Sequence, residues 1–593
     1  MPTLGGRPVT GRVVRRSREH RSRRRAGRAG GQGLRCTAAV ALLLAVVLTA
    51  CQSSSGNAQD KKLPAASVNQ VDPATLADGG TLRWGINELP AQWNPHHANG
   101  NLATVQTVMG ALLPSPWRTG SDADSAPDPD YVEDVDVRTD PRQVVTLRLN
   151  PKARWSNGDP ITWRDYAAMA EALSGRDPEF QVAGQTGYDR ISSVRAGRDR
   201  FEVVVAFSKP FADYASLFRL LLPAAYTEDA ERFNSGYLDR IPVTAGPFGS
   251  AKFDRTAKSI AVARSADWWG DRARLDRIVF RAMAPEALEA AFLDGGVDLA
   301  PLPVDSAAAK RVDKAADGEV RAARAPDFRH LTLNGESPLL SDVDVRHAVF
   351  LGVNRRAVAE SAFSGLDWRP EPTDHHFLLP GQDGYTDNSG KWGAYDPEKA
   401  REVLEGAGWR AAGDGEPRRK GGKELRLRFT IPQGFAPAQS EAELVQSMLA
   451  EIGVAVRIDS VPRDALFADH ILPGDYDMVA LVSNGSGFPV SQFLQQWSTP
   501  LKAENGDEQW RANVGRIGSP AIDAAMDEAL GSLDPEAALA SINDADRLLW
   551  DTGHTLPLYQ RPELVATRTG LANVGAPGFA DIDYAAIGYP RGG

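Results

Sequence analysis

The chain has 593 residues, of which 42% are hydrophobic and 24% charged, and its formal net charge is −10. A chain of this length can bury enough apolar surface for two or three domains. The negative balance argues against nucleic acid as a partner, because phosphate backbones select patches of Lys and Arg. Cys36 and Cys51 are its two cysteines, which are too few for a disulfide-stabilised scaffold.

The first fifty residues have the pattern of an export signal. Residues 1–35 carry eleven Arg and one acid, Glu19, and residues 38–50 are apolar and uncharged. This apolar run suits the central part of a signal peptide and is shorter than the about 20 residues that a membrane-spanning helix needs. We therefore predict a signal peptide over residues 1–50.

Cys51 follows Leu48-Thr49-Ala50, and this combination resembles the bacterial lipobox. The resemblance implies that Cys51 is diacylated and becomes the first residue of the mature chain, anchored on the extracytoplasmic face of the cell membrane. An ordinary secretory signal followed by an incidental cysteine is the alternative. The small polar residues after Cys51 predict a flexible tether, which we place at residues 51–80.

Removal of the signal peptide would make the protein more acidic. The first 50 residues carry a net charge of +10, from eleven Arg and one Glu, so the remaining residues carry −20. Residues 418–423, with the sequence RRKGGK, are a short basic cluster flanked by Gly and acids. This pattern predicts a solvated hairpin loop rather than a nucleic-acid site.

Apolar strands alternate with amphipathic helices along the chain, which predicts a mixed α/β fold. The predicted elements are, in chain order, a strand at 81–86, a loop at 119–130, a strand at 144–149, a helix at 165–173, a strand at 201–207 and a loop at 411–423. The loops are assigned from their Gly, Pro and Asp content. No internal repeat of solenoid or propeller period is present in the sequence.

A series of segments in fixed order resembles one protein family over nearly the whole chain after residue 80. These segments occupy residues 154–162, 244–248, 265–270, 292–299, 331–334, 339–348, 395–400, 407–409, 449–454, 476–477 and 556–559. In them the chain is similar to the bacterial extracellular solute-binding proteins of the oligopeptide, dipeptide and nickel group, the receptors of ABC importers. Most of the residues have structural interpretations, such as Trp155 in a core and Asp396 as a helix cap.

The resemblance implies a two-lobe α/β fold of the periplasmic-binding-protein (Venus flytrap) type, in which hinge closure encloses a ligand. The expected boundaries are a first lobe at 81–326 with a subdomain at about 104–240, a second lobe at 327–554, and a return of 555–593 to the first lobe. The resemblance also implies delivery of a small ligand, by family default a peptide, to an ABC permease and ATPase complex. No cofactor is expected.

The expected ligand pocket departs from the family pattern at one position. In peptide receptors of this family an Asp holds the peptide α-ammonium, and the corresponding position here is Gly485. A buried ammonium needs a charge partner, so either another acid replaces that Asp, or the amine is exposed, or the ligand has no free amine. If free peptides are bound, we expect Asp374, the one acid in the predicted pocket loops, to hold the ammonium. The other candidate ligand-binding residues are Trp93, Asn94, His96, His375, Tyr385, Asn484 and Trp497.

Two pairs of adjacent histidines lie in predicted pocket loops, at 96–97 and 375–376. If the pairs met across the closed pocket, their imidazoles would suit a metal ion or a metal chelate. Adjacent His residues on a loop do not easily face one ion, and we expect no metal site. A glycan ligand, or an envelope regulatory or scaffold role for a lipoprotein with this fold, remains an alternative.

An enzyme is not expected. The sequence has no G-x-S-x-G, H-E-x-x-H or Walker motif, and no thiol nucleophile would remain after signal-peptide removal and lipidation. The paired acids Asp134/Asp136 and Asp342/Asp344 are interpreted as exposed strand edges or helix caps, because an acid/base dyad needs a cleft and two different environments.

Overall fold

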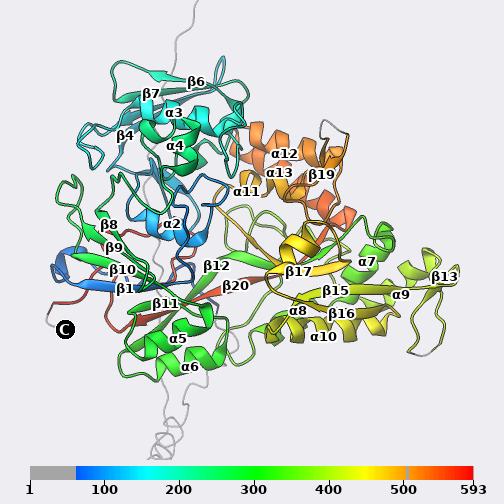
Figure 1. Ribbon diagram of the computed structural model, residues 1–593. Coiled ribbons are helices and arrows are strands. Elements are labelled where there is room, and N and C mark those ends of the chain that lie inside the picture. The colour runs from blue at the N-terminus through cyan, green and yellow to red at the C-terminus, as the bar shows by residue number, and fades with distance from the viewer. Residues whose placement is uncertain (1–61, 414, 503–505, 592–593) are drawn as a thin grey trace, which may run out of the picture. The chain divides into compact units, whose positions relative to one another are not determined.

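The computed structural model describes residues 62–413, 415–502 and 506–591. A ten-stranded sheet has the order β16-β15-β17-β12-β20-β11-β1-β10-β9-β8 (Figure 1). Its strands are β1 (Thr81–Ile86), β8 (Phe248–Asp254), β9 (Ser259–Arg264), β10 (Arg277–Ala282), β11 (Leu299–Pro301), β12 (Gly318–Leu333), β15 (Arg426–Pro432), β16 (Ala455–Val461), β17 (Met478–Asn484) and β20 (Thr555–Arg568). The predicted signal peptide and Cys51 lie outside the described residues.

Two long strands join the two halves of this sheet. β12 pairs antiparallel with β20 along one edge and with β17 along the other, and β20 also pairs with β11. β12 and β20 thus belong to both halves, as the crossing strands of a two-lobe protein do. We call the half that contains β1 and β8–β11 the first lobe, and the half that contains β15–β17 the second lobe.

The first lobe carries a second, four-stranded antiparallel sheet. Its order is β4-β5-β7-β6, and its strands are β4 (Val132–Arg138), β5 (Val144–Leu149), β6 (Ile191–Ala196) and β7 (Glu202–Phe207). The first lobe also contains the ribbon of β2 (Trp117–Thr119) and β3 (Ser125–Pro127) and the α-helices α2 (Ala103–Gly110), α3 (Trp163–Leu173), α4 (Ala230–Ser235), α5 (Pro285–Leu293) and α6 (Ser306–Asp313).

Helix α3 shows how the Trp-Gly segment contributes to packing. Thr162 and Asp165 form a capping box that satisfies the first backbone N–H groups of the helix. The indole of Trp155, which is buried, donates from Nε1 to Asp165 Oδ1 at 3.3 Å. The core interpretation of Trp155 is therefore confirmed.

In the second lobe, β15 runs parallel to both β16 and β17. β15 pairs with β17 only at Phe429 with Met478 and at Thr430 with Val479, and the two strands then separate. The second-lobe helices are α7 (Val343–Gly352), α8 (Arg355–Ala362), α9 (Pro397–Gly406), α10 (Ala436–Glu451), the π-helix η6 (Leu466–Ile471), α11 (Pro489–Trp497), α12 (Pro520–Gly531) and α13 (Pro535–Thr552). Two short ribbons complete it, β13 (Arg419–Lys420) with β14 (Lys423–Glu424), and β18 (Leu501–Lys502) with β19 (Glu508–Gln509).

Two local predictions for this lobe can be compared with the structure. Asp396 caps α9 through the backbone N–H of Lys399, as its position before a Pro predicts. The basic cluster forms the β13–β14 hairpin, but Arg418 is buried and donates to the carbonyls of Ile452 and Trp409. Residue 418 is thus a structural residue rather than part of a solvated loop.

Residues 62–80 differ from the expectation of a flexible tether. Ser67 exchanges backbone hydrogen bonds with Ala576, and Val71 does so with the side chain of Asn573. Leu76 in the same segment is buried. Because these backbone groups and this apolar side chain are satisfied by the C-terminal segment, residues 62–80 belong to the folded domain.

No helix within the described residues combines the length and the apolar character needed to cross a membrane.

Candidate ligand-binding cleft

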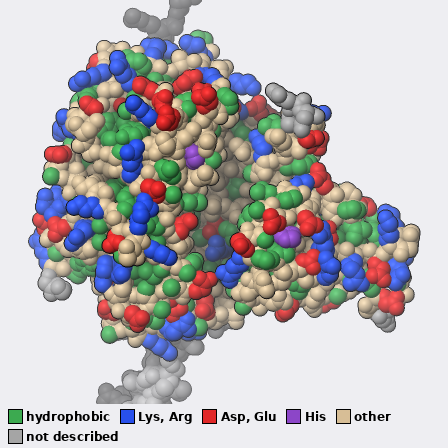
Figure 2. Space-filling view, viewed as in Figure 1, with side chains coloured by type: hydrophobic (Ala, Val, Ile, Leu, Met, Phe, Trp, Pro, Cys, Tyr) green, Lys and Arg blue, Asp and Glu red, His purple; other side chains and the backbone are tan. Residues whose placement is uncertain are grey.

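A cavity of about 450 Å³ lies between the two lobes. Figure 2 shows the molecular surface hollowed between the side that carries α2 and the side that carries β17 and α11. The cavity is lined by Thr119, Gly184, Thr186, Ser216 and Arg219 of the first lobe, by Pro326 of β12, by Gly485, Ser486, Gly487, Phe488, Ser491 and Gln492 of the second lobe, and by Gly578, Phe579 and Asp581 near the C-terminus. Its volume is in the range of small-molecule sites.

The second-lobe wall is a loop of small residues after β17. Gly485 donates its backbone N–H to the carbonyl of Pro326 at 2.7 Å, and Gln382 donates to the carbonyl of Ser486 at 3.1 Å. A Cβ on Gly487 would lie 2.2 Å from the carbonyl oxygen of Ala123 in the first lobe. Glycine at 487 therefore allows the backbones of the two lobes to approach each other here.

Arg219 forms the charged part of the first-lobe wall. Its guanidinium donates to Asp581 at 3.1 Å, to Thr119 Oγ1 at 2.7 Å and to Ser125 Oγ at 2.9 Å. The residues on either side, Phe218 and Leu220, both have a left-handed backbone, with φ of +63° and +47°. Such conformations cost energy in residues other than glycine and occur often at functional sites.

Several contacts join the two lobes. Asp213 of the first lobe accepts hydrogen bonds from the backbone N–H and the hydroxyl of Ser491, in the first turn of α11. The guanidinium of Arg219 lies 5.4 Å from the ring centroid of Phe488, a cation–π distance. Ala212 also donates its backbone N–H to the carbonyl of Leu530 at 2.7 Å. The two lobes are therefore in contact in this structure.

A second cavity, of about 530 Å³, adjoins the first along β17 and α11. Residues 480–483 of β17 line the second cavity, whereas residues 485–488 line the first. Helix α11 contributes Gln492 to the first cavity and Gln496, one turn later, to the second. The second cavity lies where β15 and β17 separate, and its wall includes Pro432 at the end of β15.

The first-lobe candidate residues line neither of the cavities described here and are held by the protein itself. Trp93 is fully buried against Phe253, and Asn94 is fully buried and donates to the carbonyl of Phe233. His96 Nε2 lies 3.0 Å from the carbonyl of Leu220, to which it donates. Burial lowers the pKa of His96 to about 4, so this ring supports the left-handed turn around Arg219 in its neutral form.

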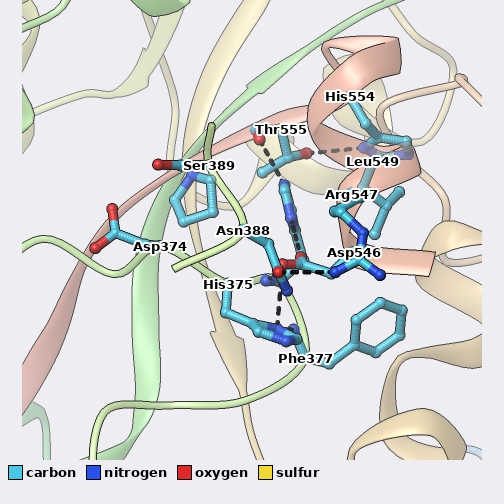
Figure 3. Close-up of polar contacts among 12 residues, drawn as sticks. Asp374, His375, Phe377, Asn388, Ser389, Asp546, Arg547, Leu549, His554 and Thr555 are labelled. Carbon is cyan, nitrogen blue, oxygen red and sulfur yellow. Dashed lines mark hydrogen bonds and ion pairs between the residues drawn. The ribbon is translucent and has the colours of Figure 1, made fainter. Parts of the chain in front are cut away.

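Asp374 has a partner other than a ligand. Its carboxylate accepts from Arg355 Nη2 at 2.7 Å, and its backbone N–H donates to the hydroxyl of Tyr385. Burial raises the pKa of Asp374, an effect that Arg355 opposes. In Figure 3 its carboxylate points away from the group around Asp546. Asp374 and Tyr385 line neither cavity, and the role of Asp374 in binding an ammonium remains a prediction.

The second histidine pair lies in the core of the second lobe, and Figure 3 shows His375 near Asp546. His375 and His376 are fully buried, and their Nδ1 atoms lie 3.6 Å and 2.7 Å from the carboxylate of Asp546. His375 Nδ1 accepts the backbone N–H groups of Phe377 and Leu378. The two histidine pairs thus have separate partners, and the described residues contain no group of three or more His, Cys, Asp or Glu placed to hold a metal ion.

Of the remaining candidates, one lines the cleft. Gly485 is part of the first cavity. Asn484 is exposed at the end of β17, next to the lining residues of both cavities. Trp497 is buried at the end of α11 and packs edge-on against His376 and His554. The ligand-binding roles of these residues remain predictions.

The sequence did not indicate the polar residues of the first-lobe wall. Arg219 and Asp581 are 362 residues apart, and Asp581 also accepts the backbone N–H of Thr119 at 2.7 Å. The local sequence patterns around Thr119, Arg219 and Asp581 do not indicate that these three residues meet. Phe488 lies within the stretch that carries Gly485, so its segment was identified although its contact with Arg219 was not.

Comparison with known proteins agrees with this architecture. Residues 126–505 match the model of the middle part of the bacterial extracellular solute-binding proteins, family 5. The chain is 38% identical over 566 residues to the oligopeptide-binding protein OppA of Mycobacterium tuberculosis (strain ATCC 25618 / H37Rv), which covers 93% of each chain.

Two solved structures have the same fold. The periplasmic EDTA-binding protein EppA has a TM-score of 0.80 at 23% identity, covering 90% of this chain and 99% of EppA. The oligopeptide-binding protein AppA of Bacillus subtilis, in complex with a nonapeptide, has a TM-score of 0.71 at 17% identity, covering 87% and 100%. The predicted two-lobe α/β fold is therefore confirmed, and the chain belongs to family 5 of the bacterial extracellular solute-binding proteins.

Proposed function

We propose that this solute-binding protein captures peptides in the interlobe cleft and delivers them to an ABC permease. The observation that carries the proposal is the free edge of β17. In the part of the chain that the structure describes, β15 pairs with β17 no further than Val479, so the edge of residues 480–484 on that side has no strand partner.

An unpaired strand edge is suited to an extended peptide. A peptide laid along such an edge gains main-chain hydrogen bonds, and its successive side chains point in alternate directions. Here the edge lines the second cavity and ends at the first. The small residues 485–487 leave backbone accessible at its end. These features favour recognition of the ligand main chain, which is common to peptides of different sequence.

The relatives support the same ligand class. OppA of M. tuberculosis is named for oligopeptide binding, and AppA was solved with a nonapeptide. The carboxylate of Asp581, which lines the first cavity, is paired with Arg219. We therefore infer that main-chain contacts, rather than an ion pair with the α-ammonium, provide most of the affinity.

Backbone N-methylation of a bound peptide tests this proposal. In a heptapeptide, methylation of an amide that donates to the β17 edge should weaken binding about 2- to 10-fold, because one hydrogen bond contributes about 0.5–1.5 kcal/mol. Methylation of the neighbouring amides, which point away from the edge, should have little effect. The measurement is isothermal titration calorimetry of a series methylated at one position at a time.

Two controls accompany this series. Free and N-acetylated versions of the same peptide should bind with about equal affinity. In small-angle scattering, the protein should have a smaller radius of gyration with peptide than without it. Absence of binding by any peptide, or an unchanged scattering profile at saturation, would contradict the proposal. Binding of a glycan or a metal chelate instead would assign the cleft to one of the alternatives.

We also propose that Cys51 anchors the protein to the outer face of the cell membrane. Cys51→Ser should move the protein from the membrane fraction to the medium, because a mature chain without the acyl groups has lost its anchor. Peptide affinity should stay unchanged, because the described cleft residues are far from position 51 in the sequence. The measurement is immunoblotting of membrane and medium fractions, and a Ser variant that stays with the membrane would contradict the anchor.

A further inference from the structure

A third cavity, of about 400 Å³, lies within the first lobe, and we call it the chamber. All of its lining residues belong to the first lobe or to the stretch 577–585 near the C-terminus. Its wall includes the aromatic side chains of Trp117, Tyr131, Trp268 and Tyr584. The chamber is nearly as large as the first cavity, of about 450 Å³, so it has room for part of a ligand.

The chamber and the first cavity lie on opposite sides of a thin wall. In strand β2, Arg118 lines the chamber, whereas Thr119, the next residue, lines the first cavity. Arg219 and Asp581 line both. Since one side chain reaches both spaces only where little else lies between them, Arg219 and Asp581 form the partition between the chamber and the first cavity.

Hydrogen bonds hold this partition closed. The guanidinium of Arg219 donates to the carboxylate of Asp581 and to a hydroxyl on each strand of the β2–β3 ribbon. The Thr119 backbone N–H donates to the Asp581 carboxylate at 2.7 Å, and the Asp581 backbone N–H donates to the Thr119 carbonyl at 3.0 Å. Because hydrogen bonds between charged groups are stronger than neutral ones, the members of the partition support one another.

The backbone on both sides of Arg219 is fixed as well. Phe218 donates its backbone N–H to the hydroxyl of Tyr188 at 2.8 Å. Leu220 donates its backbone N–H to Ser115 Oγ at 3.0 Å. Both residues have a left-handed backbone, which persists only where the surroundings impose it. Arg219 therefore cannot turn away from the partition without the loss of these contacts.

A closed partition limits the space that a ligand in the first cavity can use. A peptide that extended through it would have to separate Arg219 from Asp581 and leave their hydrogen bonds unmade. Resting on the proposed peptide function, we propose that Arg219 sets the maximum length of the bound peptide by closing the first cavity against the chamber. Arg219 is then a determinant of ligand size, and it acts by excluding the end of the peptide rather than by binding a side chain.

A series of peptide lengths tests the partition. The probes are peptides of alternating Ala and Gln, from pentapeptide to dodecapeptide, titrated calorimetrically into the full-length protein. In the wild type the affinity should stop rising at a limiting length. In Arg219→Ala, peptides beyond that length should gain about 10-fold in affinity relative to the peptide of limiting length, because the residues that enter the chamber bury further surface.

Filling the chamber separates its role from that of the first cavity. Gln106, exposed on α2, lines the chamber but not the first cavity. Gln106→Trp should change no affinity in the wild-type background, and it should remove the gain for long peptides when it is combined with Arg219→Ala. Arg219→Lys keeps the cation but has fewer donors, so its gain should be smaller.

Arg255→Ala is the matched control and should leave the length limit unchanged. Arg255 is an exposed arginine of the first lobe, it pairs with Asp239, and it lines neither the chamber nor the first cavity. If Arg219→Ala does not fold, Arg219→Ala combined with Asp581→Ala replaces it in the same series, because this double variant leaves no carboxylate without its partner.

The outcomes distinguish this inference from the peptide function. An unchanged length limit in Arg219→Ala, or a change of equal size at every length, would overturn the partition. A gain for long peptides that persists when Gln106→Trp is added would overturn it too. In each of these cases peptides bind and the peptide function stands, whereas failure of every peptide to bind the wild type would contradict the function itself.

Discussion

Replacement of Asp546 by Asn should lower the free energy of unfolding by about 3–5 kcal/mol, the cost of leaving a buried charge without its partner. His376 Nδ1 lies 2.7 Å from Asp546 Oδ1, and His376 Nε2 lies 2.8 Å from the carbonyl of Thr555. A carbonyl and an ionised carboxylate only accept hydrogen bonds, so both ring nitrogens must carry a proton. His376 and Asp546 are therefore a buried ion pair.

The matched control lies on the same helix. Asp544 is exposed and pairs with Arg547 on the surface of α13, so Asp544→Asn should change stability by less than about 1 kcal/mol. Urea denaturation followed by tryptophan fluorescence measures both variants. Equal stability of the two would show that the Asp546 carboxylate does not stabilise the fold.

The pair also gives stability a dependence on pH. Burial alone would raise the pKa of Asp546, but His375 and His376 outweigh it and hold the pKa below its usual value. A carboxyl whose pKa is lower when folded contributes fully above the unfolded value of about 4. That contribution is lost as the pH falls through the folded value. Asp546→Asn should lack this loss of stability at acid pH.

Removal of the Asp213 carboxylate should weaken ligand binding by about 5- to 30-fold, the equivalent of a helix cap worth about 1–2 kcal/mol. Phe488, at the N-cap position of α11, provides no side-chain cap, and Asp213 of the first lobe accepts from Ser491 instead. This contact exists only when the lobes touch, so its loss shifts the equilibrium towards the open form that binds ligand less well.

Asp213→Ala should therefore lower affinity for a heptapeptide in calorimetry and increase the radius of gyration at subsaturating peptide. Asp239→Asn is the control, because Asp239 belongs to the same lobe and pairs with Arg255 at the surface. Unchanged affinity in Asp213→Ala would mean that the contact does not contribute to closure.

Local structure could be predicted from sequence where the pattern is itself local. The strands at 81–86 and 144–149 agree with β1 and β5 to the residue, and the helix predicted from Asp165 begins at Trp163, directly after its Thr162 cap. Each depends on alternation or capping within a few positions. The two lobes followed from family segments that are dispersed along the chain.

The site could be predicted only in part. Gly485, which lines the first cavity, was identified because its position corresponds to the ammonium-binding Asp of the family, whereas Arg219 and Asp581 meet only after folding. Trp93 and Asp374 were chosen for residue type and loop position, which do not reveal whether a side chain is already engaged. In the structure Trp93 packs in a core, and Asp374 is paired with Arg355.

Folding of the first lobe depends on the C-terminal segment of the chain. β20 supplies a neighbour to β11, and residues 571–590 pair with residues 62–80, more than 490 positions earlier. A nascent chain therefore lacks the strand that pairs with β11, and the partners of residues 62–80, until residues 555–590 have been made. Its folding must be late and dominated by contacts distant in sequence, which fold slowly and leave apolar surface open to chaperones and proteases in the meantime.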